Sequence, residues 1–471
     1  SRRGLPARSI PKRRARRNGG CRTGAFCPTS SAETSKPAVL VKGEASLAIA
    51  TPEGYRALSV DTVAAYLAEL PAIHDRLGGA PEDWRVSEVG DGNLNLVFIV
   101  EGRTGDLCVK QALPYVRLVG ESWPLGLKRA WFEHRAAAIQ SRHAPDQVPE
   151  LLHYDEKLYL IAMARCHPHI IMRRGMIQGI VYPEFAAHIA EYLATTLYFT
   201  SDMALPAAEK KQLIAAFCGN TELCKITEDL IFTDPYMICD RNRWTSPQLD
   251  GEAERIRGDD ALKRAVSALK LKFLCEAQAL LHGDLHTGSI MVTPEDTKVI
   301  DPEFAFVGPM GFDVGKLLGN LLMSFFSQRG HERAPGEREA YRRWILATTE
   351  EVWSRFERRF LELWSAYPTG DAYPRALFEG QPGRAALREA QTGYLRALYR
   401  DALGYAGCAM IRRTLGLAHN IDMEWIEDPD CRAACERRNL RLARELILEP
   451  GRFGVIAQVT ARATEIEAAS A

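Results

Sequence analysis

The most informative segment of the chain is His282-Gly283-Asp284-Leu285-His286-Thr287-Gly288-Ser289, and Asp301-Pro302-Glu303 follows it twelve residues later. Asp284 and Asp301 are expected at the ends of two short strands. One carboxylate so placed can orient an attacking hydroxyl, and the other can hold Mg²⁺ on phosphates. The metal neutralises phosphate charge, and the acceptor must be held in line with the leaving oxygen. Alone, each aspartate would more simply cap a turn or begin a loop, but together and in this order they indicate a kinase.

A glycine-containing segment, Gly90-Asp91-Gly92-Asn93-Leu94-Asn95, lies between two expected strands at 84–89 and 94–101. A third strand is expected at 107–110, so this region predicts an antiparallel sheet. That setting differs from the strand–loop–helix arrangement of a Rossmann or Walker loop. Gly90 and Gly92 would let the backbone approach a phosphate where a Cβ atom would intrude.

Lys110 ends the third expected strand and can bind nucleotide phosphates as a point charge. Such a lysine needs a carboxylate to fix its position, and Glu133 in the expected helix at 127–143 is the best candidate. A solvated helix face is the alternative for Glu133. Two more strands are expected at 151–154 and 159–163, and the remainder is mainly helical. The predicted fold class is α+β with two lobes: a β-rich N-terminal lobe with an antiparallel sheet, then a mainly helical C-terminal lobe.

These motifs resemble the protein-kinase-like superfamily in its aminoglycoside-phosphotransferase branch, and within that branch the methylthioribose kinase family. The resemblance runs from roughly residue 55 to residue 450, in the family's order. The loop at 282–290 and the Asp-Pro-Glu motif are highly specific, and the glycine segment is moderately so. The matching segments are 90–95, 109–115, 120–124, 232–235, 282–290, 298–313 and 410–414.

The resemblance implies an ATP- and Mg²⁺-dependent kinase that converts 5-methylthioribose to 5-methylthioribose 1-phosphate in methionine salvage. It implies that Asp284 accepts the proton of the C1 hydroxyl, and that the protein is a homodimer. The residues it assigns to ATP are Gly90, Asp91, Gly92, Asn93, Asn95, Lys110, Glu133 and Met163. Those it assigns to the metal are Asp301, Glu303 and Ser289, and those for the sugar are Asp284, Arg412, Arg413, Asn95 and Trp123.

Two positions differ from the usual kinase motifs, and one segment differs from the methylthioribose kinase family. The fifth residue after the catalytic aspartate is usually a metal-binding Asn, and here it is Ser289. The usual Asp-Phe-Gly is replaced by Asp301-Pro302-Glu303, so we hypothesise that Glu303 takes over part of the metal coordination. Both changes agree with the methylthioribose kinase pattern. The hinge expected after Met163 reads Ala164-Arg165-Cys166 instead of the family's acidic residues, a change that backbone recognition of adenine tolerates.

Arg412 and Arg413 lie in an apolar helical context. Adjacent residues cannot both face one side of a helix, so at least one guanidinium is expected to point inward. A buried guanidinium needs an anionic partner, and the resemblance places this pair at the sugar site. A structural salt bridge is the alternative. For Trp123, the resemblance implies a lid near the active site, and simple packing is the alternative.

Two other functions remain open at this point. One is a related small-molecule kinase acting on an aminoglycoside, choline or homoserine; a cationic substrate would favour acidic or aromatic residues over two arginines. The other is a non-catalytic binding module that kept the kinase fold. The presence of Lys110, Asp284 and Asp301 together argues against this module.

The composition excludes several classes of protein. Sixty basic and sixty acidic residues among 471 argue against a dedicated nucleic-acid binder. No run of eighteen apolar residues occurs, so a membrane span is not expected. Eleven scattered cysteines suit a reducing compartment, and the predicted location is the cytoplasm.

The first 32 residues contain nine basic and no acidic side chains, whereas the rest of the chain contains 51 basic and 60 acidic ones. This composition fits a disordered tail or a start-site artefact, with an organelle transit peptide as the alternative. The expected organisation is an N-terminal extension at 1–50, an N-terminal lobe at 51–165, a C-terminal lobe at 166–460 and a short tail at 461–471.

Overall fold

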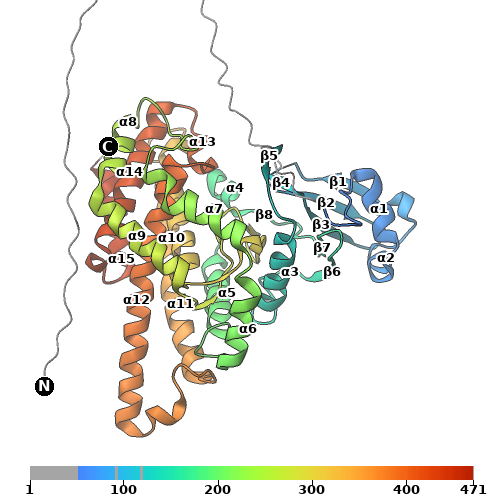
Figure 1. The fold of residues 1–471 in the computed structure, drawn as a ribbon. Coiled ribbons are helices and arrows are strands. Elements are labelled where there is room, and N and C mark those ends of the chain that lie inside the picture. Colours follow the sequence, from blue (N-terminus) through green and yellow to red (C-terminus); the bar gives the residue numbers. More distant parts are fainter. Residues whose placement is uncertain (1–50, 91–93, 117–119, 470–471) are drawn as a thin grey trace, which may run out of the picture. The chain divides into compact units, whose positions relative to one another are not determined.

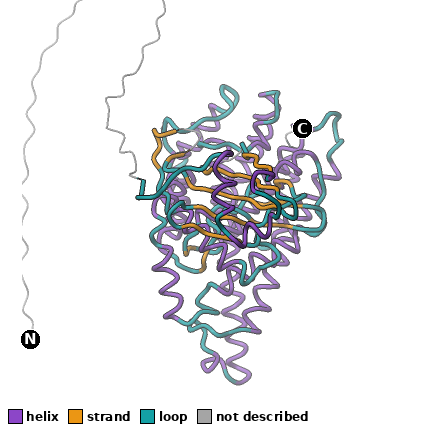
Figure 2. The backbone as a smooth tube through the Cα atoms, turned by 90° about the vertical axis from the view of Figure 1, so that its right-hand side faces the viewer, coloured by secondary structure: helices purple, strands orange, loops and turns teal. Residues whose placement is uncertain are grey.

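A computed structural model describes residues 51–90, 94–116 and 120–469 of the chain. A five-stranded antiparallel sheet occupies the N-terminal part (Figures 1 and 2). Its strands in spatial order are β1 (Arg85–Glu88), β2 (Asn95–Glu101), β3 (Asp106–Ala112), β7 (Leu160–Met163) and β6 (Leu151–Asp155). The predicted antiparallel sheet followed by a helical remainder is confirmed.

The two faces of the sheet have different environments because successive side chains of a strand point to opposite faces. Leu107 and Val109 of β3 pack in an apolar core with α1 (Val60–Ala68) and α2 (Pro71–Leu77). Lys110, between them and the end of the strand, contacts α3 (Arg129–Gln140) instead. The alternation within β3 therefore directs one buried lysine toward the helical part of the protein.

A short hairpin follows β3 that the sequence pattern did not reveal. It consists of β4 (Tyr115–Val116) and β5 (Gly120–Pro124), which pair antiparallel. Two small sheets then flank the loop at 282–289, for which the sequence predicts a catalytic role and which is called the catalytic loop below. They are β8 (Ile170–Ile171) with β10 (Ile290–Val292) and β11 (Thr297–Val299), and β9 (Ala279–Leu280) with β12 (Val307–Gly308).

Helices form most of the remainder (Figure 1). They are α4 (Met172–Gln178), α5 (Phe185–Phe199), α6 (Ala207–Phe217), α7 (Thr221–Phe232), α8 (Asp250–Gly258), α9 (Asp260–Cys275), α10 (Gly311–Ser327), α11 (Glu339–Ala366), α12 (Gly380–Leu415), α13 (Ile421–Glu424), α14 (Pro429–Leu448) and α15 (Ile456–Ala468). None of the helices in the described part of the chain has the length and apolar character needed to cross a bilayer.

Helix α10 is the centre of the helical core, and all of its residues are buried. It packs closely on α12, because a Cβ atom at Gly315 would lie only 2.3 Å from the carbonyl oxygen of Ala402. This close approach brings α10 near the C-terminal end of α12. Lys316 lies on α10, and Arg412 and Arg413 lie at that end of α12.

Candidate active site

One carboxylate, on α10, anchors the backbone of the loop between β9 and β10. Asp313, buried in the first turn of α10, accepts hydrogen bonds from the backbone N–H groups of His282 (2.6 Å) and Gly283 (3.0 Å). Gly283 has φ +81°, and a Cβ atom there would lie 2.1 Å from the carbonyl oxygen of Phe304. Only glycine fits this combination of backbone angle and space.

His282 joins the catalytic loop to the strand that precedes Asp301. Its Nε2 donates to the carbonyl oxygen of Ile300 at 2.8 Å, and its Nδ1 accepts the backbone N–H of Asp284 at 3.2 Å. The tautomer follows from this network, since one ring nitrogen of a neutral imidazole donates and the other accepts. The backbone positions of Asp284 and Asp301 are therefore linked through one side chain.

The carboxylate of Asp284 is contacted on both of its oxygens. Lys316 of α10 donates a hydrogen bond to Oδ1, and Nε2 of His286 lies 3.4 Å from Oδ2. Burial alone would raise the pKa of Asp284, but Lys316 and His286 hold it well below its usual range. Burial lowers the pKa of His286 to about 3, and its Nδ1 accepts the N–H of Gly288, so the ring is neutral and Nε2 carries the proton.

The second predicted aspartate meets the predicted lysine. The Nζ atom of Lys110 lies 2.8 Å from both Oε1 of Glu133 and Oδ1 of Asp301. Burial opposes the charge of Lys110, but the carboxylates of Asp301 and Glu133 outweigh it and raise the pKa of the lysine. Asp301 has a left-handed backbone (φ +64°), which is unusual for a residue with a Cβ atom, and its side chain is 45% exposed. Its second oxygen is therefore accessible to a ligand.

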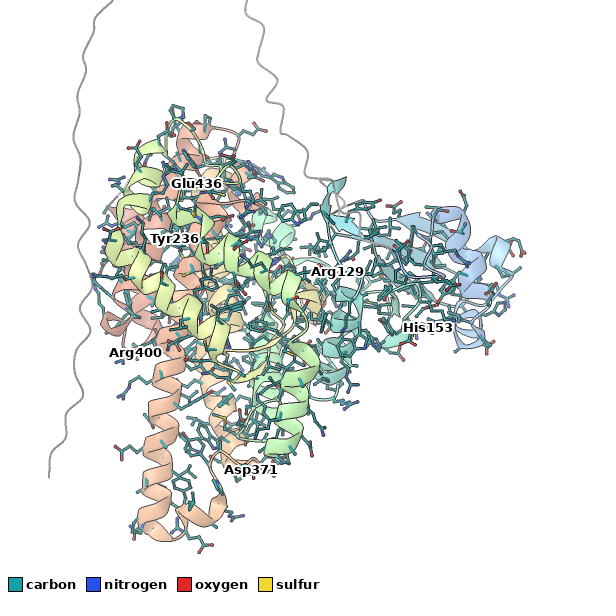
Figure 3. All side chains as sticks on the ribbon, in the orientation of Figure 1. Arg129, His153, Tyr236, Asp371, Arg400 and Glu436 are labelled. Atoms are coloured by element: carbon teal, nitrogen blue, oxygen red, sulfur yellow. The ribbon has the colours of Figure 1, made fainter. Side chains whose placement is uncertain are left out.

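Glu303 lies in a buried polar network that the sequence did not indicate (Arg129 is labelled in Figure 3). Its Oε2 accepts a hydrogen bond from Nδ2 of Asn95 (3.0 Å) and lies 3.6 Å from Nε of Arg129. Arg129 also donates to Oδ1 of Asn95 (3.0 Å) and to the carbonyl oxygen of Leu94 (2.8 Å). The network thus connects the end of the glycine segment, α3 and the Asp-Pro-Glu turn.

The structure places the remaining predicted nucleotide and metal residues as follows. Gly90 is exposed, and no atom lies within 4 Å of a Cβ added there; Asp91, Gly92 and Asn93 lie outside the described residues. The hydroxyl of Ser289 donates within the loop, to the carbonyl oxygens of Asp284 (3.0 Å) and His286 (2.9 Å). Its role as a metal ligand stays a prediction.

The predicted hinge begins where β7 ends. Met163 pairs with Cys108 of β3, and the N–H of Ala164 donates to the carbonyl oxygen of Glu150 at 2.8 Å. Arg165 forms ion pairs with Glu101 (2.5 Å) and Asp106 (3.1 Å) at the ends of β2 and β3. The unusual arginine of the hinge is therefore bound to the sheet.

Two of the predicted sugar residues, Arg412 and Arg413, belong to a cluster of buried cations, called the cationic cluster below. Arg412 and Arg413 occupy the last turn of α12, and Arg173 of α4 lies beside them. Burial and the neighbouring Arg413 lower the pKa of Arg412 to about 9, and they lower that of Arg173 to about 10. Asp422 lies 3.3 Å from Nε of Arg173. Nε of Arg412 is buried without a hydrogen-bond partner, so one donor of this guanidinium is unsatisfied in the absence of a ligand.

Trp123 belongs to β5 and is partly buried. It packs against a small apolar cluster that contains Leu125 and Leu223, together with Leu94 from the glycine segment and Phe304 from the Asp-Pro-Glu turn. The structure therefore shows packing for Trp123, while its function as a lid stays a prediction.

Similarity to known proteins identifies the family. Residues 85–364 match the family model described as "Phosphotransferase enzyme family". A rice protein (Oryza sativa subsp. japonica) named Methylthioribose kinase 1 is 46% identical over 412 residues, which is 86% of this chain and 95% of that protein. The chain belongs to the methylthioribose kinase family. Another member, from Escherichia coli O45:K1, is also 46% identical, over 85% of this chain and 96% of its own length.

The similarity to solved structures is lower than the similarity to these sequence relatives. The ethanolamine kinase of Plasmodium vivax is 12% identical, covers 81% of this chain and 86% of its own, and superimposes with a TM-score of 0.42.

Several charged residues of this methylthioribose kinase family member were missed by sequence reasoning. They are Arg129, Arg173, Asp313, Lys316 and Asp422. A signal existed for two of them, since Asp313 and Lys316 are charged residues within an otherwise apolar helix, at a spacing of three that places them on neighbouring positions of one face. No such signal marks Arg129 or Arg173, whose partners are distant in sequence.

Proposed function

We propose that the chain is an ATP- and Mg²⁺-dependent kinase that phosphorylates the C1 hydroxyl of 5-methylthioribose. The observation that carries the proposal is the placement of Asp284 between two groups of residues. Lys110 and Asp301, suited to a nucleotide and its metal, are linked to Asp284 through His282. Arg412 and Arg413 of the cationic cluster lie close enough for their charges to interact with Asp284. The family members support methylthioribose as the acceptor.

In the proposed reaction, the C1 hydroxyl oxygen forms a bond to the γ-phosphorus of ATP, and the bond from that phosphorus to the bridging oxygen of ADP breaks. The hydroxyl proton passes to Asp284. A carboxylate with a lowered pKa is a weak base, so its main contribution is to orient the hydroxyl. An anomeric hydroxyl is more acidic than an ordinary alcohol, and it therefore suits a weak base.

The residues near the proposed nucleotide site fit a magnesium nucleotide. Magnesium prefers oxygen ligands and commonly takes one or two carboxylates together with substrate phosphates. Asp301 would supply one carboxylate oxygen, and Glu303 lies two residues away. Within the described ranges, no three acidic, histidine or cysteine side chains form a metal site by themselves, which suits a metal held jointly with phosphates. When bound, Mg²⁺ would neutralise phosphate charge and orient the transferring group.

We also propose the finer organisation of the protein. The lobes meet near residue 165, where the sheet ends, and Trp123 closes over bound substrate.

The protein is also proposed to be a homodimer that is located in the cytoplasm. Light scattering of the purified chain would give its mass in solution, and a monomer across micromolar concentrations would contradict the dimer.

The decisive experiment measures ATP- and Mg²⁺-dependent ADP release against 5-methylthioribose, ribose, choline, homoserine and kanamycin. We expect turnover of methylthioribose, identified as the 1-phosphate by phosphorus NMR. Asp284→Asn should lower kcat by about 10²–10⁴ while the KM for ATP changes little. Preferential turnover of choline, homoserine or kanamycin would contradict the proposed substrate and favour a related small-molecule kinase.

A further inference from the structure

Lys316 makes a contact that the proposed reaction does not yet explain. It lies on the second turn of α10, 32 residues after Asp284, and donates a hydrogen bond to Oδ1 of that aspartate. The ring of Phe312, one turn earlier, lies 5.2 Å from Nζ. Among the residues that the structure describes, Asp284 alone accepts a hydrogen bond from this ammonium group and forms an ion pair with it.

The two partners differ in their access to solvent. The side chain of Lys316 is 4% exposed, and that of Asp284 is 28% exposed. The lysine is therefore the more deeply buried partner, and a ligand that reaches this pair from solvent would meet Asp284 first. His286 contacts the other oxygen, Oδ2. The carboxylate is thus fixed at both oxygens while one edge stays open.

A buried ion pair is weak as a stabilising device, because desolvation of both charges offsets their attraction. The surroundings of Lys316 increase this cost: burial lowers its pKa, and Arg412 and Arg413 lower it further. A cation that is buried beside other buried cations indicates a function for its charge. The catalytic carboxylate must approach an acceptor oxygen that attacks a negatively charged phosphoryl group, and an unneutralised carboxylate would repel that group.

We propose that Lys316 is the positioning residue of Asp284: from its buried position it fixes Oδ1, and it neutralises the carboxylate that would face the transferring phosphoryl group. This inference rests on the proposed phosphoryl transfer to an acceptor hydroxyl. In that step Lys316 keeps its protons. It acts through Asp284, so its effect should fall on kcat and should depend on the presence of the aspartate.

The test compares Lys316→Met and Lys316→Arg with the wild-type enzyme. In Lys316→Met we expect kcat to fall about 30- to 100-fold, with each KM changed less than threefold, and in Lys316→Arg we expect kcat within about fivefold of wild type. Lys272→Met is the matched control, because Lys272 also pairs with an aspartate (Asp401, 2.7 Å) on α12. It should keep wild-type kcat.

A double-mutant cycle separates positioning from a purely structural role. In an Asp284→Asn background, Lys316→Met should lower kcat less than threefold further, whereas a structural defect would cost the same in both backgrounds. A kcat within threefold of wild type in folded Lys316→Met, an increase in kcat, or a change confined to KM would overturn the proposal. If Lys316→Met does not fold, Lys316→Gln replaces it and is judged by the same limits.

The design also distinguishes failure of this inference from failure of the proposed function. If the wild-type enzyme does not phosphorylate methylthioribose, the proposed substrate is wrong. The same variants are then compared on any acceptor of the panel that is turned over, or on acceptor-independent hydrolysis of ATP. An equal rate for wild type and Lys316→Met in that assay would overturn the inference about Lys316.

Discussion

Arg129 and Glu303 lie together although 174 positions separate them, with Nε of the arginine 3.6 Å from Oε2 of the glutamate. Asn95 contacts both side chains, so the glycine segment, α3 and the Asp-Pro-Glu turn share one buried network. A carboxylate held in this way is oriented before a ligand arrives. The same contacts would fix Glu303 for a contribution to magnesium binding.

Glu303→Gln tests that contribution. Glutamine keeps an oxygen for Asn95 but removes the charge opposite Arg129 and weakens any metal interaction. We expect the Mg²⁺ concentration for half-maximal activity to rise about tenfold or more. The measurement is a magnesium titration of kinase activity at saturating ATP. Glu150→Gln, which alters an exposed Arg–Glu pair with Arg76, is the control and should leave the titration unchanged. An unchanged titration in Glu303→Gln would show that Glu303 serves only to anchor its neighbours.

Gly283→Ala should destabilise the protein strongly. The substitution places a Cβ atom 2.1 Å from a backbone oxygen at a φ of +81°. Gly336 offers a matched control, because its φ is +84° and no atom lies within 4 Å of an added Cβ. Gly336→Ala should cost only the backbone term, about 1–2 kcal/mol, and Gly283→Ala should exceed it by about 2 kcal/mol or more. Urea unfolding of both variants measures the difference. Equal losses would indicate that the loop relaxes away from Phe304.

The sequence predicted those parts of the site that depend on local pattern. The alternation of strands and turns located the sheet, and the need of a buried lysine for a carboxylate pointed from Lys110 to Glu133, which the structure brings within 2.8 Å. Contacts set by helix packing could not be predicted in this way. Lys316 reaches Asp284 because α10 packs against the catalytic loop, and Arg173 of α4 lies beside Arg413. The spacing of Asp313 and Lys316 marks them as charged residues of one apolar helix but does not identify their partners, and Arg173 has no such signal.

His286 should make the protein sensitive to acid. Its pKa is about 3 in the folded protein because of burial, against about 6.5 in an unfolded chain. Between these values the unfolded chain binds a proton that the folded protein does not, so the free energy of unfolding falls as the pH falls below 6.5. From pH 7 to pH 5 the loss from this group should be about 2 kcal/mol.

Urea unfolding at pH 7 and pH 5 tests this effect. His286→Asn keeps an acceptor for the N–H of Gly288 but does not titrate in this range, so its stability should depend less on pH. His167→Asn, at an exposed position, is the control and should retain the acid sensitivity of the wild type. Equal acid sensitivity in wild type and His286→Asn would rule out His286 as the source.

Arg412 should be a residue whose removal lowers activity without lowering stability. Its buried Nε has no hydrogen-bond partner, and its neighbours Arg413, Arg173 and Lys316 are also cationic. Arg412→Met removes one of several clustered positive charges, which outnumber the nearby Asp284, and keeps much of the side-chain volume, so we expect the free energy of unfolding to rise by about 1 kcal/mol. We expect kcat/KM for methylthioribose to fall at least about 100-fold, since charged hydrogen bonds to substrate are lost. Arg441→Met, on the exposed face of α14, should leave both quantities unchanged. A loss of stability together with activity in Arg412→Met would instead identify Arg412 as a structural residue of the α12 terminus.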